Sequence, residues 1–369
     1  MPAKKGKVWK VGVVGFAHMH VLDLMKSFAE TGSVEWVACA DTVPVRPSLS
    51  DQGGTRGSNL RHAVEAYKVP KVYEDHSEML EAGGLDIVIA CPENVRHAEV
   101  IEPILAKGIH VLVEKPMAVS YGDALRMQKA SANNGAALVV NWPSTWSPTV
   151  RAAHEVLSSG RYGRLLKFYY RNGPSMGPFE YGQSLSPREK GAEWWHTRSE
   201  GGGAMLDYCC YGACLARWFC GPTAVSAYGM RANLNSPYGD ADDYGTMAVR
   251  FAESVAVLEG SWVTYNNGFP NGPILYTDKA TIVTMGWGEG EVLVYGDKYG
   301  EPTARVKAKP LPKGRESVAK EMLEYLGKGV PLHPTLELGF NLEAMAVLDA
   351  GLRSAESGRH EPVRDPAWA

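Results

Sequence analysis

The chain has 369 residues and a formal net charge of -3 at pH 7, with 45% hydrophobic and 21% charged residues. This is ordinary globular composition for two domains, and it excludes a disordered or fibrous protein. The lack of a basic excess argues against nucleic acid as the main partner. The six cysteines lack paired spacing, and we find neither a signal peptide nor an apolar run long enough to span a membrane. We therefore expect a cytoplasmic protein with reduced thiols.

The first part of the chain alternates short apolar runs with helical patterns. Residues 8–14 are expected to form a strand that leads through Gly15 into a helix ending near Thr31. Further strands are expected at 34–40, 71–73, 86–90, 109–113 and 137–141, and further helices at 59–67, 97–107 and 120–134. Residues 44–57 are polar and are expected to form a loop. This alternation predicts an α/β domain over residues 1–145, built on a parallel, doubly wound sheet.

Beyond residue 145 the pattern changes to strands with little helix between them. After a helix at 148–159, strands are expected at 165–171, 224–230, 246–251, 255–263, 280–285, 291–295 and 304–307. A long loop is expected at 172–200, and helices at 201–219, 315–327 and 335–356. Strands joined by short turns indicate a mainly antiparallel sheet. We therefore expect an α+β second domain over residues 146–369, whose closing helices can pack back on the first domain.

The turn after the first strand reads Gly15-Phe16-Ala17-His18-Met19-His20. Such a turn can hold a dinucleotide pyrophosphate, because glycine lets the backbone approach and the helix N-terminus supplies N–H groups. Only the first glycine of the G-x-G-x-x-G pattern is present; Ala17 adds only a methyl group, whereas His20 is too large for the usual close helix–sheet contact. We expect His18 to contact pyrophosphate or substrate, with ordinary packing as the alternative. We expect no metal site, because residues two apart in a helix point away from each other.

Two further stretches stand at the ends of predicted strands. Asp41 ends the second strand, where a carboxylate would accept hydrogen bonds from the adenosine ribose and repel a 2′-phosphate. This favours NAD over NADP, while Arg46 nearby leaves NADP open; a turn-forming aspartate is the simpler alternative. The loop Cys91-Pro92-Glu93-Asn94 leaves another strand at the same edge. Its proline and asparagine suit a loop that grips the cofactor, and His97 would begin the next helix, with a plain strand–helix connection as the alternative.

Glu114-Lys115-Pro116 follows the apolar run 109–113, which is typical of a buried strand. Proline stops the strand, and the lysine then stands at the sheet edge that faces the ligand crevice. For an isolated motif of this kind, a solvated lysine in a turn is the simpler interpretation. A second feature, Gly201-Gly202-Gly203, opens a predicted helix on which Asp207 and Tyr211 are four residues apart and share a face. An ammonium beside such a tyrosine would lower its pKa from about 10, which completes an acid–base group.

In combination these motifs resemble the glucose–fructose oxidoreductase / inositol dehydrogenase / rhizopine catabolism (Gfo/Idh/MocA) family, in the right order over nearly the whole chain. The resemblance implies a Rossmann domain and a second domain with a large open sheet, often a cis peptide before Pro116, and homodimers or homotetramers that pack through that sheet. It makes Lys115 the motif lysine, Asp207 the helix carboxylate and Tyr211 the proton-transfer residue. Most members have histidine where this chain has Tyr211, which resembles the glucose–fructose oxidoreductase and dihydrodiol dehydrogenase branches.

The function expected from the resemblance is hydride transfer between NAD (or NADP) and a hydroxyl-bearing carbon of a sugar, sugar derivative or cyclitol. The cofactor-binding residues expected are Gly15, Phe16, Ala17, His18, Asp41, Cys91, Pro92, Asn94, His97, Glu114 and Lys115. The substrate-binding residues expected, chosen for aromatic faces and hydrogen-bonding groups that suit a sugar, are Asn141, Trp142, Arg171, Trp195, His196 and Arg198. The alternatives are a glycoside hydrolase or lyase that recycles a bound NAD, and a non-catalytic NAD-binding sugar sensor.

Overall fold

A computed structural model describes residues 7–172, 185–264, 272–286, 288 and 290–364. These residues form two compact units. The first unit comprises 7–141, 185–201 and 313–338; the second comprises 142–172, the described part of 202–312, and 339–364.

The first unit is built on a parallel sheet, whose described strands lie in the order β3-β2-β1-β4-β5-β6. The strands are β1 (Trp9–Val14), β2 (Val34–Ala40), β3 (Val72–Tyr73), β4 (Ile87–Ala90), β5 (His110–Glu114) and β6 (Leu138–Asn141). The helices are α1 (His20–Ala29), α2 (Arg56–Tyr67), α3 (His76–Ala82), α4 (His97–Ala106), α5 (Tyr121–Asn134) and α9 (Val318–Lys328). Every residue of β4 and β6 is buried, as in a parallel sheet covered on both faces. The predicted doubly wound α/β fold is confirmed.

The order of the strands in this sheet reverses between β1 and β4. In an open α/β sheet, the crevice at the carboxyl ends of the strands beside such a reversal is where ligands bind. The turn after β1 and the loop after β4 therefore meet at the position expected for a dinucleotide.

Helix α2 begins at Arg56, three residues before the predicted start. The reason is local: the side chain of Thr55 accepts a hydrogen bond from the backbone N–H of Ser58 and caps the helix. The prediction of a loop as far as residue 57 was therefore wrong at its end. The correction matters because it moves Arg56 from a loop to the first turn of a helix.

The second unit is built on a mixed, mainly antiparallel sheet, whose described strands lie in the order β14-β13-β12-β11-β7-β10-β9-β8-β15. The strands are β7 (Leu165–Asn172), β8 (Ala224–Ala232), β9 (Tyr244–Phe251), β10 (Val255–Ser261), β11 (Gly272–Thr277), β12 (Thr281–Met285), β13 (Glu291–Tyr295), β14 (Ala304–Lys307) and β15 (Glu361–Pro362). The helices are α6 (Pro148–Ser158), α8 (Ala204–Cys220) and α10 (Leu338–Ser357). Strands β7 and β10 are parallel neighbours. The predicted α+β class is confirmed.

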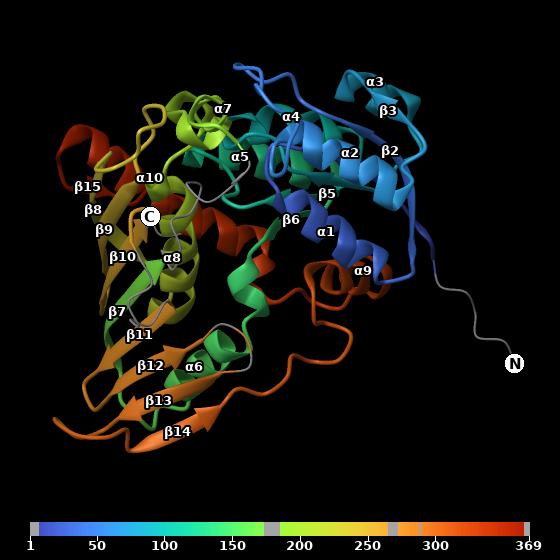
Figure 1. Cartoon of the computed structure of the whole chain (residues 1–369). Helices are drawn as coiled ribbons and strands as arrows, with labels where there is room; N and C mark the ends of the chain where they lie inside the picture. The colour runs from blue at the N-terminus through green and yellow to red at the C-terminus, as the bar shows by residue number, and fades with distance from the viewer. Residues whose placement is uncertain (1–6, 173–184, 265–271, 287, 289, 365–369) are drawn as a thin grey trace, which may run out of the picture. The chain divides into compact units, whose positions relative to one another are not determined.

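Helix α8 lies closely against this sheet because glycines in the strands leave room for it (Figure 1). A Cβ on Gly260 would lie 2.6 Å from the carbonyl oxygen of Ala204, and one on Gly245 would lie 2.3 Å from the Cβ of Met205. The helix starts at Ala204 rather than at Gly201, and its first turn is held by Asp242, whose Oδ2 accepts a hydrogen bond of 2.8 Å from the Met205 N–H. These contacts fix the position of α8 on the sheet.

The stretch predicted as a loop over 172–200 contains short helices where the structure describes it. They are α7 (Pro187–Gly191), η4 (Trp194–His196) and η5 (Arg198–Glu200). Ser186 and Glu189 form a reciprocal capping box at the start of α7. The prediction missed this signal, since glycine, proline and aromatic residues dominate the stretch.

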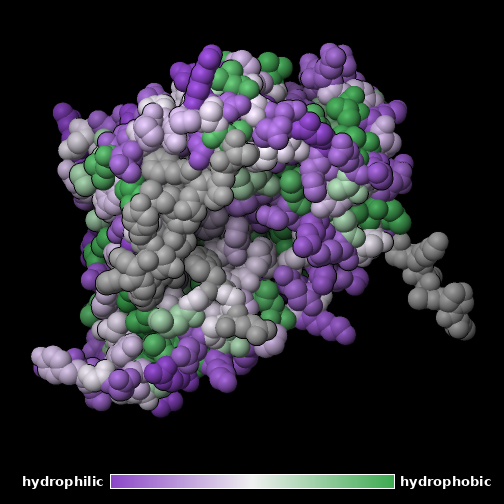
Figure 2. All heavy atoms as spheres, in the orientation of Figure 1, coloured by the Kyte–Doolittle hydropathy of each residue, from purple (hydrophilic) through white to green (hydrophobic). Residues whose placement is uncertain are grey.

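On the face drawn in Figure 2, hydrophilic side chains predominate and hydrophobic ones are scattered among them. Scattered apolar residues are normal on a protein surface. Among the described residues, the helices are all too short or too polar to cross a membrane.

Candidate functional site

The turn after β1 lies directly against the loop after β4. Gly15 has a φ of +82°, and a Cβ there would lie 2.4 Å from the backbone nitrogen of Pro92. The His18 N–H donates a hydrogen bond of 3.4 Å to the carbonyl of Cys91. The structure thus brings together Gly15, His18, Cys91 and Pro92, as expected for a dinucleotide cradle, and the first glycine of the degraded pattern occupies the position that most requires it.

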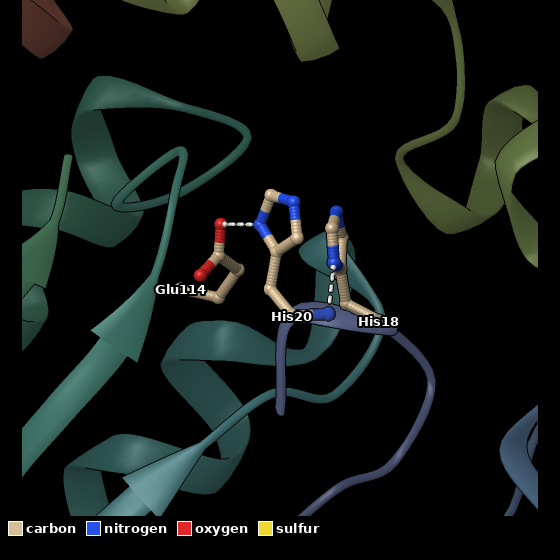
Figure 3. Close-up of side chains that lie close together, drawn as sticks. All are labelled: His18, His20 and Glu114. Carbon is tan, nitrogen blue, oxygen red and sulfur yellow. Dashed lines mark hydrogen bonds and ion pairs between the residues drawn. The ribbon is translucent and has the colours of Figure 1, made fainter. Parts of the chain in front are cut away.

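His18, His20 and Glu114 form a small group beside this turn (Figure 3). Glu114 ends β5, and its Oε1 lies 2.9 Å from Nδ1 of His20, whose ring stands between Glu114 and His18. The other carboxylate oxygen accepts a hydrogen bond of 2.8 Å from the side-chain amide of Asn141. Asn141, expected to contact substrate, therefore holds Glu114 in place.

The two histidine rings lie side by side, with their centroids 4.2 Å apart. The expectation that they point away from each other was wrong, because His18 precedes α1 and only His20 belongs to the helix. Candidate ligand atoms of His18, His20 and Glu114 all lie within 4.8 Å of one another. The three side chains are therefore close enough together to hold a metal ion.

The hydrogen bonds of His18 argue against metal binding. Its Nδ1 accepts a hydrogen bond of 3.1 Å from the backbone N–H of His20. Burial, with added effects of His20 and Lys115, lowers the pKa of His18 well below its ordinary value, so the ring is neutral. In a neutral imidazole whose Nδ1 accepts a hydrogen bond, Nε2 carries the hydrogen and has no lone pair for a metal. The arrangement is therefore a hydrogen-bonding group that offers an N–H donor.

Lys115 follows Glu114 and is only 2% exposed. The Lys115–Pro116 peptide bond is cis, as the family resemblance implied. His97, which begins α4 as predicted, is buried, and its Nδ1 lies 3.2 Å from the carbonyl oxygen of Met117. His97 therefore supports the turn that follows β5.

We expect Glu114→Gln to remove a pH-dependent part of the stability. Burial alone would raise the pKa of Glu114, but the charge and hydrogen bond of His20, with Lys115 and Asn141, hold it below 4.5. A carboxylate whose pKa is lower in the folded state stabilises the fold above the unfolded pKa, and this contribution disappears as pH falls through the folded pKa. The variant should lose about 1–3 kcal/mol near neutral pH.

Urea unfolding of both proteins from about pH 7 down to about pH 2.5 measures this contribution, since the difference in free energy of unfolding should shrink as pH falls below the unfolded pKa of about 4.5 and through the lower folded pKa. A difference that stays constant with pH would show that Glu114 is not the titrating group.

Asp41, at the end of β2, has a partner that the sequence analysis did not identify. Asp41, predicted to bind ribose hydroxyls, already pairs with Arg56, whose Nε lies 2.7 Å from its Oδ2. The second partner of Arg56 is Glu93, at 2.7 Å. The sequence reasoning missed Arg56 and Glu93, although the Thr55 cap could have placed Arg56 at the start of a helix. Arg46, the arginine considered there, is exposed.

The described part of the segment 185–201 packs on the turn after β1. The indole N–H of Trp194 donates a hydrogen bond of 2.9 Å to the carbonyl of Ala17, and the Asn94 amide donates one of 2.8 Å to the carbonyl of Gly201. Asn94, expected to grip the cofactor, thus also anchors this segment. Tyr181, another aromatic of the predicted recognition loop, lies outside the described residues.

The predicted substrate residues of this segment have contrasting surroundings. Trp195 and His196 are buried, while Arg198 is exposed. Burial, with a smaller effect of Lys190, lowers the pKa of His196 to about 3, so the ring is neutral. Trp195 and His196 are therefore withdrawn from solvent in this structure.

In the second unit, Asp207 and Tyr211 both lie on α8. The indole N–H of Trp262 donates a hydrogen bond of 3.2 Å to Oδ2 of Asp207. Tyr211 is 7% exposed, and its ring meets the edge of Trp142 with centroids 5.9 Å apart. Trp142 in turn donates a hydrogen bond of 2.6 Å to Asn341. Two tryptophans thus fix the two groups that the sequence singled out for acid–base work.

Arg171, another predicted substrate residue, lies on β7 in the same unit. Its Nε is 3.6 Å from a carboxylate oxygen of Glu259 on β10, the parallel neighbour of β7. In this structure Arg171 is therefore part of an ion pair within the sheet.

Models of known protein families match both parts of the chain. Residues 9–142 match an oxidoreductase family described as having an NAD-binding Rossmann fold, and residues 150–284 match the GFO/IDH/MocA C-terminal domain. The chain belongs to the GFO/IDH/MocA family. The resemblance inferred from the motifs is confirmed at this level.

Three relatives illustrate the range of the family. The chain is 30% identical over 156 residues (42% of this chain, 36% of the relative) to 1-carboxy-3-chloro-3,4-dihydroxycyclo hexa-1,5-diene dehydrogenase of Comamonas testosteroni. It is 28% identical over 165 residues (44% of this chain, 45% of the relative) to inositol 2-dehydrogenase of Salmonella typhimurium. Its fold resembles the WlbA dehydrogenase from Bordetella pertussis, solved with NADH and UDP-GlcNAcA, with a TM-score of 0.72, 21% identity, and coverage of 97% of this chain and 99% of that chain.

The match to the curated relatives covers less than half of their length, 36% and 45% for the two named above. The structural likeness extends over almost all of this GFO/IDH/MocA chain, but at 21% identity it concerns the fold alone. The activity and substrate of this protein are therefore matters of proposal.

Proposed function

We propose that this protein is an NAD-dependent oxidoreductase that moves a hydride between the nicotinamide and a hydroxyl-bearing carbon of a sugar, sugar derivative or cyclitol. The observation that carries the proposal is the buried Lys115 at the carboxyl end of β5, in a chain of this family whose α8 bears Asp207 and Tyr211. A lysine is rarely buried unless it is paired or used in chemistry.

The residues of the first unit fit a dinucleotide. The turn at Gly15 leaves no room for a side chain, and the N-terminus of α1 follows it, which suits a diphosphate. Glu114 and Lys115 would lie on the nicotinamide side of the crevice, and Asp41 on the adenosine side. The bound nicotinamide would supply hydride acceptance and donation.

In this proposal the residues of the chain handle the proton. Tyr211 takes the proton of the substrate hydroxyl when the carbon is oxidised, and returns it in the reverse direction. We assign to Lys115, the motif lysine, the orientation of that hydroxyl. Asp207, held by Trp262, binds a neighbouring hydroxyl. Arg198, one of the exposed residues of the segment 185–201, is the residue of this segment that we propose for substrate contact.

The test is a substrate screen on the full chain. NADH absorbance is followed with NAD⁺ and a panel of aldoses, uronic acids, amino sugars and inositols. Sugar-dependent NADH formation would support the proposal. If NAD binds but a substrate is consumed without net NADH, the cofactor is recycled. If NAD binds and every panel member is inert, the sensor alternative gains support.

Two lesser features are proposed with it. The sheet face of the second unit carries large exposed apolar side chains, among them Tyr228 (51%) and Met230 (55%) on β8, which alternate with the buried Gly229. Such a patch supports homo-oligomerisation through this face. The six cysteines are all free thiols, which supports a cytoplasmic location.

A further inference from the structure

Arg56 stands between two carboxylates at the adenosine side of the first unit. Its Nε and Nη2 contact Oδ2 and Oδ1 of Asp41 at 2.7 and 3.0 Å. Its Nη1 donates a hydrogen bond of 2.7 Å to Oε1 of Glu93. The guanidinium is thus forked on Asp41 and tied to Glu93 at the same time, a geometry suited to arginine alone among the cations.

The three residues come from three different elements. Asp41 directly follows β2, Glu93 lies in the loop after β4, and Arg56 opens α2. Thr42 closes the group, since its hydroxyl donates to Oε2 of Glu93 at 2.9 Å and accepts from Nη2 of Arg56 at 2.9 Å. Side chains of Arg56 and Glu93 are 12% and 1% exposed. The group is therefore largely withdrawn from water. Charge interactions are stronger in such surroundings than in water.

The carboxylate of Asp41 already accepts most of the hydrogen bonds that it can accept. Its Oδ1 accepts from the N–H groups of Phe16 (2.9 Å) and Thr42 (2.8 Å) as well as from Arg56. Among the described residues, Oδ2 accepts from Arg56 alone. Each carboxylate oxygen offers about two acceptor positions, so Oδ2, with one donor, is the atom with room for one ribose hydroxyl.

We propose that Glu93 is a specificity-determining residue: by holding Arg56 on Asp41, it makes the adenosine side of the crevice accept NAD and reject NADP. This inference rests on the proposed use of a nicotinamide dinucleotide. It adds a residue that the predicted role of Asp41 did not include, because the arginine that could bind a 2′-phosphate is present but engaged.

The charges give the reason. Two carboxylates and one guanidinium leave the group with one net negative charge. A 2′-phosphate would bring about two more negative charges next to Asp41. It could pair with Arg56 only if the guanidinium left its partners. The buried carboxylate of Glu93 and the partly buried one of Asp41 would then lose their cation, which is unfavourable, most of all for Glu93. A ribose hydroxyl needs no such rearrangement.

Two further acids, Glu193 and Glu200, lie near this group, and both are buried. Burial raises the pKa of both carboxyls, and the charge of Glu93 raises it further. Since a raised pKa disfavours the ionised form of a carboxyl, the rejection of a 2′-phosphate rests on Asp41 and Glu93.

The experiment measures dissociation constants of NAD⁺ and NADP⁺ by tryptophan fluorescence, with wild type, Glu93→Gln and Arg56→Gln/Glu93→Gln. Glutamine keeps an oxygen for Thr42 but removes the charge that holds Arg56. We expect wild type to prefer NAD⁺, and Glu93→Gln to lower that preference at least about tenfold, mainly through tighter NADP⁺ binding. The double variant should lose the gained NADP⁺ affinity, because the arginine that would bind the phosphate is gone.

Glu99→Gln is the matched control, since it removes one negative charge from an exposed ion pair with Arg96, where the Glu99 side chain is 60% exposed. Its preference should equal that of wild type. An unchanged preference in Glu93→Gln, or a wild type that prefers NADP⁺, would overturn the inference. NAD⁺ binding without any sugar-dependent reduction would refute the proposed function instead, and the comparison of the two dinucleotides would still stand.

Discussion

Tyr211→Phe should lower kcat by about 10²–10⁴-fold, the usual loss when a positioned proton-transfer group is removed. The variant keeps the aromatic ring, and therefore the edge contact with Trp142 at 5.9 Å. It removes only the hydroxyl that we propose to carry the proton. The dissociation constant of NAD⁺ should stay within a factor of about two, because Tyr211 is not assigned to the cofactor. Steady-state kinetics with the best substrate of the screen, together with NAD⁺ titration, measure both quantities.

Tyr208→Phe provides the comparison on the same helix. Tyr208 and Tyr211 are nearly equally buried, at 8% and 7% exposure, so the two variants place the same change in similar surroundings. Tyr208 packs against Gly260 of β10, on the side of α8 that faces the sheet. We expect Tyr208→Phe to retain most of its turnover. Equal turnover of Tyr211→Phe and wild type would rule out the proposed proton transfer.

Among glycine-to-alanine substitutions in the first unit, Gly15→Ala should lower the free energy of unfolding the most. Two costs combine there. The φ of +82° disfavours any residue with a Cβ by about 1–2 kcal/mol, and the added Cβ would lie 2.4 Å from the nitrogen and 2.6 Å from the Cα of Pro92. These are backbone atoms, so relief requires movement of the loop after β4. We expect a loss of about 3 kcal/mol or more in the free energy of unfolding, together with much weaker NAD⁺ binding.

Gly32→Ala separates the two costs. Gly32 also has a positive φ, +65°, but a Cβ there would meet nothing within 4 Å. This variant should lose only about 1–2 kcal/mol, with unchanged NAD⁺ affinity. Thermal and urea unfolding of both variants measure the difference between them. If Gly15→Ala were no worse than Gly32→Ala, the close contact between the turn after β1 and Pro92 would not exist as described.

The order of elements could be read from local patterns. Apolar runs of strand length, separated by amphipathic stretches, predicted the parallel sheet of the first unit, and successive strands predicted the antiparallel sheet of the second. Such patterns arise from burial on one or both faces, which each segment records in its own residues. Helix starts were less predictable, as at Arg56, because a cap depends on one side-chain hydrogen bond.

The contacts of the motif residues could not be read in the same way. The pair of His20 with Glu114 joins residues 94 positions apart. The hydrogen bond from Trp194 to Ala17 joins residues 177 positions apart. Sequence spacing does not encode such partners, since they depend on which strand ends and loops the topology places together. For this reason the sequence indicated only that His20 is too large for a close helix–sheet contact, and it did not indicate that His20 pairs with Glu114.

The sequence by itself determined the family motifs, the strand ends that carry them and the class of chemistry they suit, since these depend on residue types at fixed local spacing. Only the tertiary structure decided how the charges are shared. Arg56 lies 15 positions from Asp41 and 37 from Glu93, and it meets both because the ends of β2 and β4 and the start of α2 converge. A charged group that is withdrawn from water pairs with whichever partner the fold brings within reach. The pairing of Asp41 with Arg56 can therefore be known only from the folded unit.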